Sequence, residues 1–180
     1  AGKSTLLQIL ADIYPASSGS VQYPTSSAYV RQDSWIFSAS IRENLIFNHS
    51  VEDHKIQQVL SDLDLGELIQ SFPDGLSTVI GQGEMTLSGG QMQRLCLARA
   101  LLLDVDWLIL DEITSALDRV SEKIVMEKIF AHSGGAIVVT HRLNYLPDFD
   151  QVVLLEDGQL IAAGKFAELM RTNQAFVNFY

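Results

Sequence analysis

The sequence predicts an α/β fold in which a mostly parallel sheet is flanked by helices and accompanied by a helical subdomain. Two short apolar runs, 107–110 and 136–140, are followed by polar residues and enclose a helical stretch at 119–131, which is the pattern of one β-α-β unit. One helix begins directly after a Gly-Lys pair, and another begins in a glycine-rich stretch at 88–91. These observations favour a sheet whose carboxyl edge carries polar groups.

The composition supports one folded, acidic domain. The 180 residues carry 12 Lys and Arg against 22 Asp and Glu, a formal net charge of −10, which disfavours a general nucleic-acid binder. The single cysteine, Cys96, has no internal disulfide partner, so we expect a reducing compartment. No apolar run reaches the roughly 20 residues of a membrane-spanning helix, and no signal peptide is recognised at the start.

The first half of the chain is predicted to be mostly helical after two short strands. Apolar residues at helical spacing and the turn residues between them set the boundaries. We expect a helix at 3–12, a turn at 15–20, strands at 21–23 and 28–31, helices at 41–47, 53–63 and 65–71, and a loop at 81–86.

The second half continues with the elements of the β-α-β unit and ends in a hairpin and short helices. The Asp157-Gly158 pair is typical of a two-residue hairpin turn. We expect a helix at 92–102, a strand at 107–110, a helix at 119–131, strands at 136–140, 151–155 and 159–163, and helices at 166–171 and 175–180.

The run Gly2-Lys3-Ser4-Thr5 at a helix start is the first candidate site. Backbone N–H groups and the helix dipole attract phosphate oxygens, a lysine reaches β- and γ-phosphates, and a following hydroxyl can bind Mg²⁺. By itself this half-motif is equally consistent with a helix that happens to begin Gly-Lys-Ser. Because the full pattern needs another glycine five residues earlier, we expect the natural chain to begin upstream, with the first strands and the first half of the loop lying there.

Acidic and imidazole groups follow the two predicted parallel strands. Asp111, at a strand end, is suited to hold the same Mg²⁺, and Glu112 to orient or deprotonate a water that attacks a γ-phosphate. His141 follows the second strand, where it could donate to that phosphate. The alternatives are a solvated acid for Glu112 and a structural histidine for His141.

A family resemblance rests on the motif Leu87-Ser88-Gly89-Gly90-Gln91 and what surrounds it. Followed by Gln93-Arg94 and Ala98-Arg99-Ala100-Leu101, this run closely resembles the signature motif of ABC-transporter nucleotide-binding domains. Further matches occur in the family's order, namely Gln32 as the Q-loop glutamine, Leu110-Asp111-Glu112 as Walker B, Ser115-Ala116-Leu117-Asp118 as the D-loop and His141 as the switch histidine. The resemblance covers almost the whole chain and implies a P-loop NTPase fold.

The resemblance also implies the site and its cofactors, ATP and Mg²⁺. Two domains would face each other head to tail, and each ATP would lie between the P-loop of one and the signature motif of the other. The implied helical subdomain spans 41–103. The implied site residues are Glu112, His141 and Gln32 for catalysis, Gly2, Lys3, Ser4, Thr5, Ser88, Gly89, Gly90 and Gln91 for nucleotide binding, Ser4, Gln32 and Asp111 for the metal, and Asp118 in the D-loop at the dimer contact.

The segment 35–47 resembles the region after the Q-loop in exporter-type ABC domains. This implies ATP-powered export of an unknown substrate, with a transmembrane domain and a second nucleotide-binding domain as partners, at the cytoplasmic face of a membrane.

Two alternatives stay open from the sequence. One is a non-transport ABC ATPase of nucleic-acid maintenance or translation, although the long coiled-coil or basic insertions usual there are missing and no nucleic-acid partner is expected. The other is that these 180 residues alone bind ATP poorly and aggregate or need a partner, because the strand before the phosphate loop would be central in the sheet.

Overall fold

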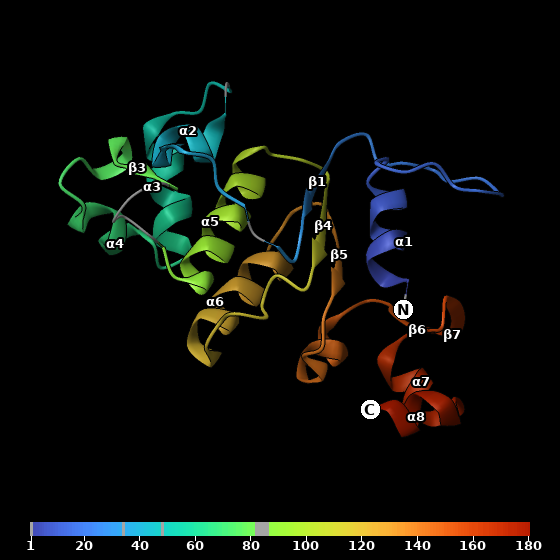
Figure 1. Ribbon diagram of the computed structural model, residues 1–180. Helices are drawn as coiled ribbons and strands as arrows, with labels where there is room; N and C mark the ends of the chain where they lie inside the picture. Colours follow the sequence, from blue (N-terminus) through green and yellow to red (C-terminus); the bar gives the residue numbers. More distant parts are fainter. Residues whose placement is uncertain (1, 34, 48, 82–86) are drawn as a thin grey trace.

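The computed structural model describes residues 2–33, 35–47, 49–81 and 87–180 (Figure 1). Most of the loop expected at 81–86 therefore lies outside the described residues. None of the helices in these ranges combines the length and apolar composition that crossing a membrane requires.

A three-stranded parallel sheet forms the centre of the molecule. Its strands are β1 (Ser27–Val30), β4 (Trp107–Asp111) and β5 (Gly135–Val139), in the order β1-β4-β5. The register aligns Val30 with Leu110 and Leu110 with Val138, so all three carboxyl ends meet at one edge. With α6 (Arg119–Phe130) between β4 and β5, the predicted β-α-β unit is confirmed.

Helices cover both faces of this sheet. The helix α1 (Lys3–Leu10) lies on one side, and α5 (Gly89–Leu102) and α6 lie on the other (Figure 1). Leu108 and Leu110 of β4 are fully buried between these layers. A strand that is apolar on both faces is the expected centre of such a three-layer arrangement.

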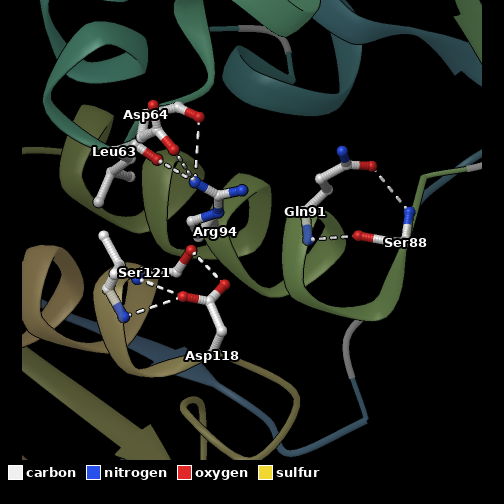
Figure 2. Close-up of polar contacts among 8 residues, drawn as sticks. Leu63, Asp64, Ser88, Gln91, Arg94, Asp118 and Ser121 are labelled. Atoms are coloured by element: carbon white, nitrogen blue, oxygen red, sulfur yellow. Dashed lines mark hydrogen bonds and ion pairs between the residues drawn. The ribbon is translucent and has the colours of Figure 1, made fainter.

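A helical region packs on the far side of α5 from the sheet. It contains α2 (Ile41–Ile46), α3 (Asp53–Asp62), α4 (Gly66–Ser71) and the 3₁₀ helix η1 (Gly75–Ser77). Arg94 of α5 connects this helical region to α5. Its guanidinium donates to the carbonyls of Leu63 (3.1 Å) and Asp64 (3.0 Å) and pairs with the Asp64 carboxylate at 2.9 Å (Figure 2). The region also holds a two-residue antiparallel pair that the sequence did not predict, β2 (Ala39–Ser40) with β3 (Val79–Ile80).

The C-terminal part forms a second, smaller core beside α1. Its elements are η2 (Leu143–Asp148), β6 (Val152–Glu156), β7 (Gln159–Gly164), α7 (Phe166–Thr172) and α8 (Gln174–Phe179). Asp157 and Gly158 both have positive φ, as the predicted hairpin turn requires. Its core consists of Leu146, Val152, Ala162, Leu169 and Phe176.

The strand predicted at 21–23 is wrong. These residues are described and form no strand, while the other prediction, 28–31, corresponds to β1. A three-residue run is short, and Pro24 directly after it has no N–H to donate to a ladder. The chain joins the sheet only near Ser26, whose Oγ donates to the Asp106 carboxylate at 3.0 Å and accepts from the Asp106 N–H at 2.9 Å.

Candidate active site

The three predicted catalytic side chains meet at the carboxyl edge of the sheet. The Gln32 Nε2 donates to one carboxylate oxygen of Glu112 at 3.1 Å, and the His141 Nε2 lies 2.9 Å from the other. Gln32, Glu112 and His141 follow β1, β4 and β5, so the parallel register brings them together from positions far apart in the sequence. Glu112 is therefore the centre of the cluster.

The backbone of Glu112 adopts an unusual conformation. Its φ is 50°, in the left-handed region, and its N–H donates to the Val139 carbonyl at 3.0 Å, which extends the β4–β5 ladder by one bond. For a residue with a side chain this conformation costs on the order of 1 kcal/mol or more, and such strain concentrates at functional sites. The sheet thus holds Glu112 in a geometry that a free loop would not favour.

Asp111 lies behind this cluster and is almost fully buried, with 3% exposure. One of its carboxylate oxygens accepts from the Tyr29 hydroxyl at 3.3 Å, and the other, Oδ1, is buried without a hydrogen-bond partner. Burial, and next the negative charge of Asp111, raise the pKa of Tyr29, so its hydroxyl remains a donor at neutral pH. A buried carboxylate oxygen with no partner is costly unless a cation or donor meets it.

The oxygen-donor set at this edge fits Mg²⁺. The described residues contain no cluster of three or more His, Cys, Asp or Glu that could enclose a metal. Mg²⁺ characteristically needs only one or two protein ligands, because it keeps waters and binds phosphate oxygens. The Asp111 Oδ1 meets that need, and the predicted ligands Ser4 and Gln32 would add a hydroxyl and an amide oxygen.

The first turn of α1 has unused N–H groups and no acidic residue. The first helical bond runs from the Leu6 N–H to the Gly2 carbonyl (3.0 Å), so the N–H groups of Lys3, Ser4 and Thr5 have no acceptor within the helix. Gly2 has φ 102°, which a side chain would strain. This end of α1 is thus suited to an anion.

A groove of about 640 Å³ runs along α1, β5 and β6, and both Lys3 and His141 are among its lining residues. Lys3 therefore faces the same space as the sheet edge that carries His141.

At the N-terminus of α5, two residues satisfy each other's polar groups. The Ser88 Oγ accepts from the Gln91 N–H at 3.2 Å, and the Gln91 Oε1 accepts from the Ser88 N–H at 2.9 Å, which is a capping box (Figure 2). The side chain of Gln91, predicted to bind nucleotide, is thus engaged in the cap. Within one chain, α1 and α5 lie on opposite sides of the sheet (Figure 1).

The two glycines of this motif lie against the loop that follows Glu112. A Cβ on Gly90 would approach the Ala116 carbonyl oxygen at 3.1 Å, and one on Gly89 would meet the Ala116 Cβ at 3.4 Å. A side chain at position 90 would therefore push on the backbone of the loop.

Asp118 ends this loop as the N-cap of α6. Its carboxylate accepts from the N–H groups of Val120 (2.9 Å) and Ser121 (3.0 Å) and from the Ser121 hydroxyl at 2.9 Å (Figure 2). The hydrogen bonds from Ser121 hold the pKa of Asp118 below its usual value. The residue predicted for a dimer contact thus has a structural role within its own chain.

Three further residues support the site without having been assigned a role from the sequence. Tyr29 donates to Asp111, Gln93 contacts Ser115 and Ala116, and Arg142 pairs with Glu122 at 3.0 Å. Arg142 could have been found, because it directly follows His141. Tyr29 and Gln93 needed the strand register and the helix packing.

Comparison with known proteins finds a matching family model and individual relatives. A family model described as "ABC transporter" matches residues 1–115. The chain is 37% identical over 180 residues to ABC transporter C family member 12 of Dictyostelium discoideum, covering 98% of this chain and 14% of that protein. It is 38% identical over 186 residues to the heterocyst differentiation ATP-binding protein HepA of Nostoc sp., covering 94% and 31%.

A third relative is the ATP-dependent lipid A-core flippase of Burkholderia pseudomallei, 34% identical over 194 residues, with 99% of this chain and 33% of that protein covered. The chain thus spans a third or less of the length of these relatives.

Proposed function

The chain belongs to the ABC transporter family, and from that premise we propose that it binds ATP with Mg²⁺ and hydrolyses it to power export across a membrane. The observation that carries this proposal is the convergence of Gln32, Glu112 and His141 beside the buried, unpartnered oxygen of Asp111. Phosphoryl transfer needs positioning and electrostatic stabilisation more than covalent chemistry, and this edge offers both.

Each group has a defined task in the proposed reaction. Lys3 and the N–H groups of the first α1 turn bind the β- and γ-phosphate oxygens, and Ser4 and Asp111 hold Mg²⁺. That ion, when bound, neutralises charge on the phosphate oxygens. Glu112 accepts a proton from the attacking water, while the oxygen of that water forms a bond to the γ-phosphorus and the bond from the γ-phosphorus to the ADP oxygen breaks. His141 donates a hydrogen bond to a γ-phosphate oxygen, and Gln32 orients the water.

We further propose that two such domains assemble head to tail around ATP. The placement of α1 and α5 on opposite sides of the sheet supports this, because the α5 N-terminus is then offered to a second copy (Figure 1). The Ser88 Oγ already accepts from Gln91, so its own hydrogen remains for a γ-phosphate oxygen of the partner's ATP. Gly89 and Gly90 would add backbone N–H groups, while Gln91 would act through its N–H bond to the Ser88 Oγ.

The remaining partner in the proposal is a transmembrane domain, which places this chain at the cytoplasmic face of a membrane. Support comes from two of the relatives, one named as an ABC transporter and the other as a flippase. The segment 35–47 offers a contact surface, because the Trp35 side chain is 64% exposed. A net charge of −10 argues against nucleic acid as a partner.

The direct test is the ATPase activity of the full-length transporter that carries this domain. We expect Glu112→Gln to lower turnover about 10²-fold or more, since it removes the proton acceptor while keeping the side-chain shape. Glu127→Gln is the matched control, because Glu127 is an exposed acid of α6 paired with Lys123 at 3.8 Å. Undiminished turnover in Glu112→Gln would remove Glu112 from the role of base.

A further inference from the structure

Gln93 is a buried polar residue for which the proposed chemistry has no use. It lies in α5, five positions after Ser88, and is only 5% exposed. Both ends of its amide are engaged by one loop, since Nε2 donates to the Ser115 hydroxyl at 2.9 Å and Oε1 accepts from the Ala116 N–H at 3.1 Å. A buried amide costs desolvation that an apolar side chain of the same size would avoid.

The loop that Gln93 holds connects the predicted base to the cap of α6. Its first residue is Glu112 and its last is Asp118, and it is closed by bonds from the Ser115 N–H to the Glu112 carbonyl (3.2 Å) and from the Leu117 N–H to the Thr114 carbonyl (3.2 Å). Ser115 is hydrogen-bonded both to Gln93 and to the backbone carbonyl of Glu112. A shift of Ser115 would therefore also move the backbone of Glu112.

The other side of this loop is held from the segment that carries His141. The Arg142 guanidinium reaches the Leu117 carbonyl at 3.5 Å and pairs with the buried Glu122 at 3.0 Å. Gln93 therefore holds the side of the loop that faces α5. Because positions 89 and 90 are glycines, the loop can lie close to α5 at Ala116, within hydrogen-bond reach of the Gln93 side chain.

We propose that Gln93 is a positioning residue. It holds the loop 112–118, and with it Glu112, in a fixed position relative to the N-terminus of α5. In one domain it joins the base that acts on that domain's own ATP to the signature motif that contacts the partner's ATP. This inference rests on the proposed function, because it assigns Gln93 a task in that same reaction.

The test compares Gln93→Met with the wild type in steady-state ATPase assays of the full-length transporter. Methionine keeps the volume and loses both hydrogen bonds. We expect kcat to fall about 10-fold or more, because a small displacement of a catalytic group has an effect of this size. The KM for ATP should change by less than about twofold, since Lys3 and the α1 N–H groups are untouched.

Ile56→Val is the matched control for general destabilisation. Ile56 is fully buried in α3, away from the loop, so this variant should lower the melting temperature and leave kcat unchanged. If Gln93 only filled space, the two variants would behave alike.

Ser115→Ala gives a second variant at an exposed position that keeps the domain folded. We expect it to lower kcat by itself and to have little further effect in the Gln93→Met background, because both act through one contact. An unchanged kcat in Gln93→Met, or effects that simply multiply in the double variant, would overturn the inference. A wild-type transporter without ATP turnover would instead contradict the proposed function.

Discussion

The carboxyl edge of the sheet and the N-terminus of α5 carry the two halves of the predicted site and are built differently. At the edge, Gln32, Glu112 and His141 follow three different strands, and Glu112 contacts the other two side chains. A buried Asp111 oxygen beside them has no hydrogen-bond partner. At the α5 N-terminus, Ser88 and Gln91 lie three positions apart in the sequence, and each accepts a hydrogen bond from the backbone N–H of the other.

This difference separates two kinds of site. The edge is poised for chemistry, because it holds acid, imidazole and a buried unpaired oxygen within one cluster. The α5 N-terminus is complete within its own chain and offers outward only a hydroxyl hydrogen and helix N–H groups. It is therefore suited to contact a ligand that another molecule holds.

The largest expected effect in this comparison is at the edge. Asp111→Asn removes the charge opposite the predicted Mg²⁺ and should lower ATP turnover about 10²-fold, with partial recovery at high Mg²⁺. The measurement is a Mg²⁺ titration of ATPase activity. Asp74→Asn, at an exposed position before η1 in the helical region, should keep the wild-type titration curve. A curve for Asp111→Asn that overlays the wild type would exclude Asp111 as a ligand.

An intermediate effect is expected where the two regions touch. In Gly90→Ala the new methyl group would press on the Ala116 carbonyl oxygen at 3.1 Å, so we expect turnover to fall about 10-fold through displacement of the loop.

Gly66→Ala is the matched control for helix propensity, because its methyl group would meet the nearest atom at an ordinary 3.7 Å. It should stabilise α4 by about 0.5 kcal/mol and leave turnover unchanged. Equal turnover in the two variants would show that the loop tolerates the methyl group.

The smallest effect is expected at Ser88, where stability and activity can be separated. Ser88→Ala and Asn173→Ala each remove a side-chain N-cap of a helix, so each should lower the free energy of unfolding by about 1 kcal/mol in urea titrations. Only Ser88→Ala should also lower ATP turnover, because it removes the hydrogen bond from this hydroxyl to the partner's ATP. Losing one hydrogen bond of roughly 1 kcal/mol corresponds to a decrease of about fivefold. Equal turnover in both variants would contradict a role for the Ser88 hydroxyl at ATP.

The sequence pattern was sufficient for the parallel strands β4 and β5 and for Glu112 and His141 after them, whereas Gln32 was identified through the family resemblance. Apolar runs ending at Asp111 and before His141 identified two parallel strands, and parallel strands present their carboxyl ends together. The contact between Tyr29 and Asp111 was out of reach, because it depends on β1 and β4 being adjacent and in a particular register.

The errors and omissions have a common physical origin in short segments. The run 21–23 has strand-forming residues but no partner strand, and the pair β2–β3 exists only because the chain brings 39–40 beside 79–80. Two or three residues contain too little pattern to distinguish these cases. The role of Gln93 was hidden for another reason, since a polar residue in a helix gives no sign of which loop its amide will meet.

The central claim is that the edge of one copy and the α5 N-terminus of another share one ATP, and a mixing experiment tests it most directly. One inactive variant carries Glu112→Gln. The other carries Ser88→Glu, whose added negative charge repels the partner's ATP while the glycines at 89 and 90, which lie against the loop, stay unchanged. In a head-to-tail pair of unlike variants, one of the two sites combines an intact edge with an intact α5 N-terminus. We predict that an equal mixture regains about a quarter of wild-type turnover, as random pairing gives. A mixture as inactive as either variant alone would contradict the claim.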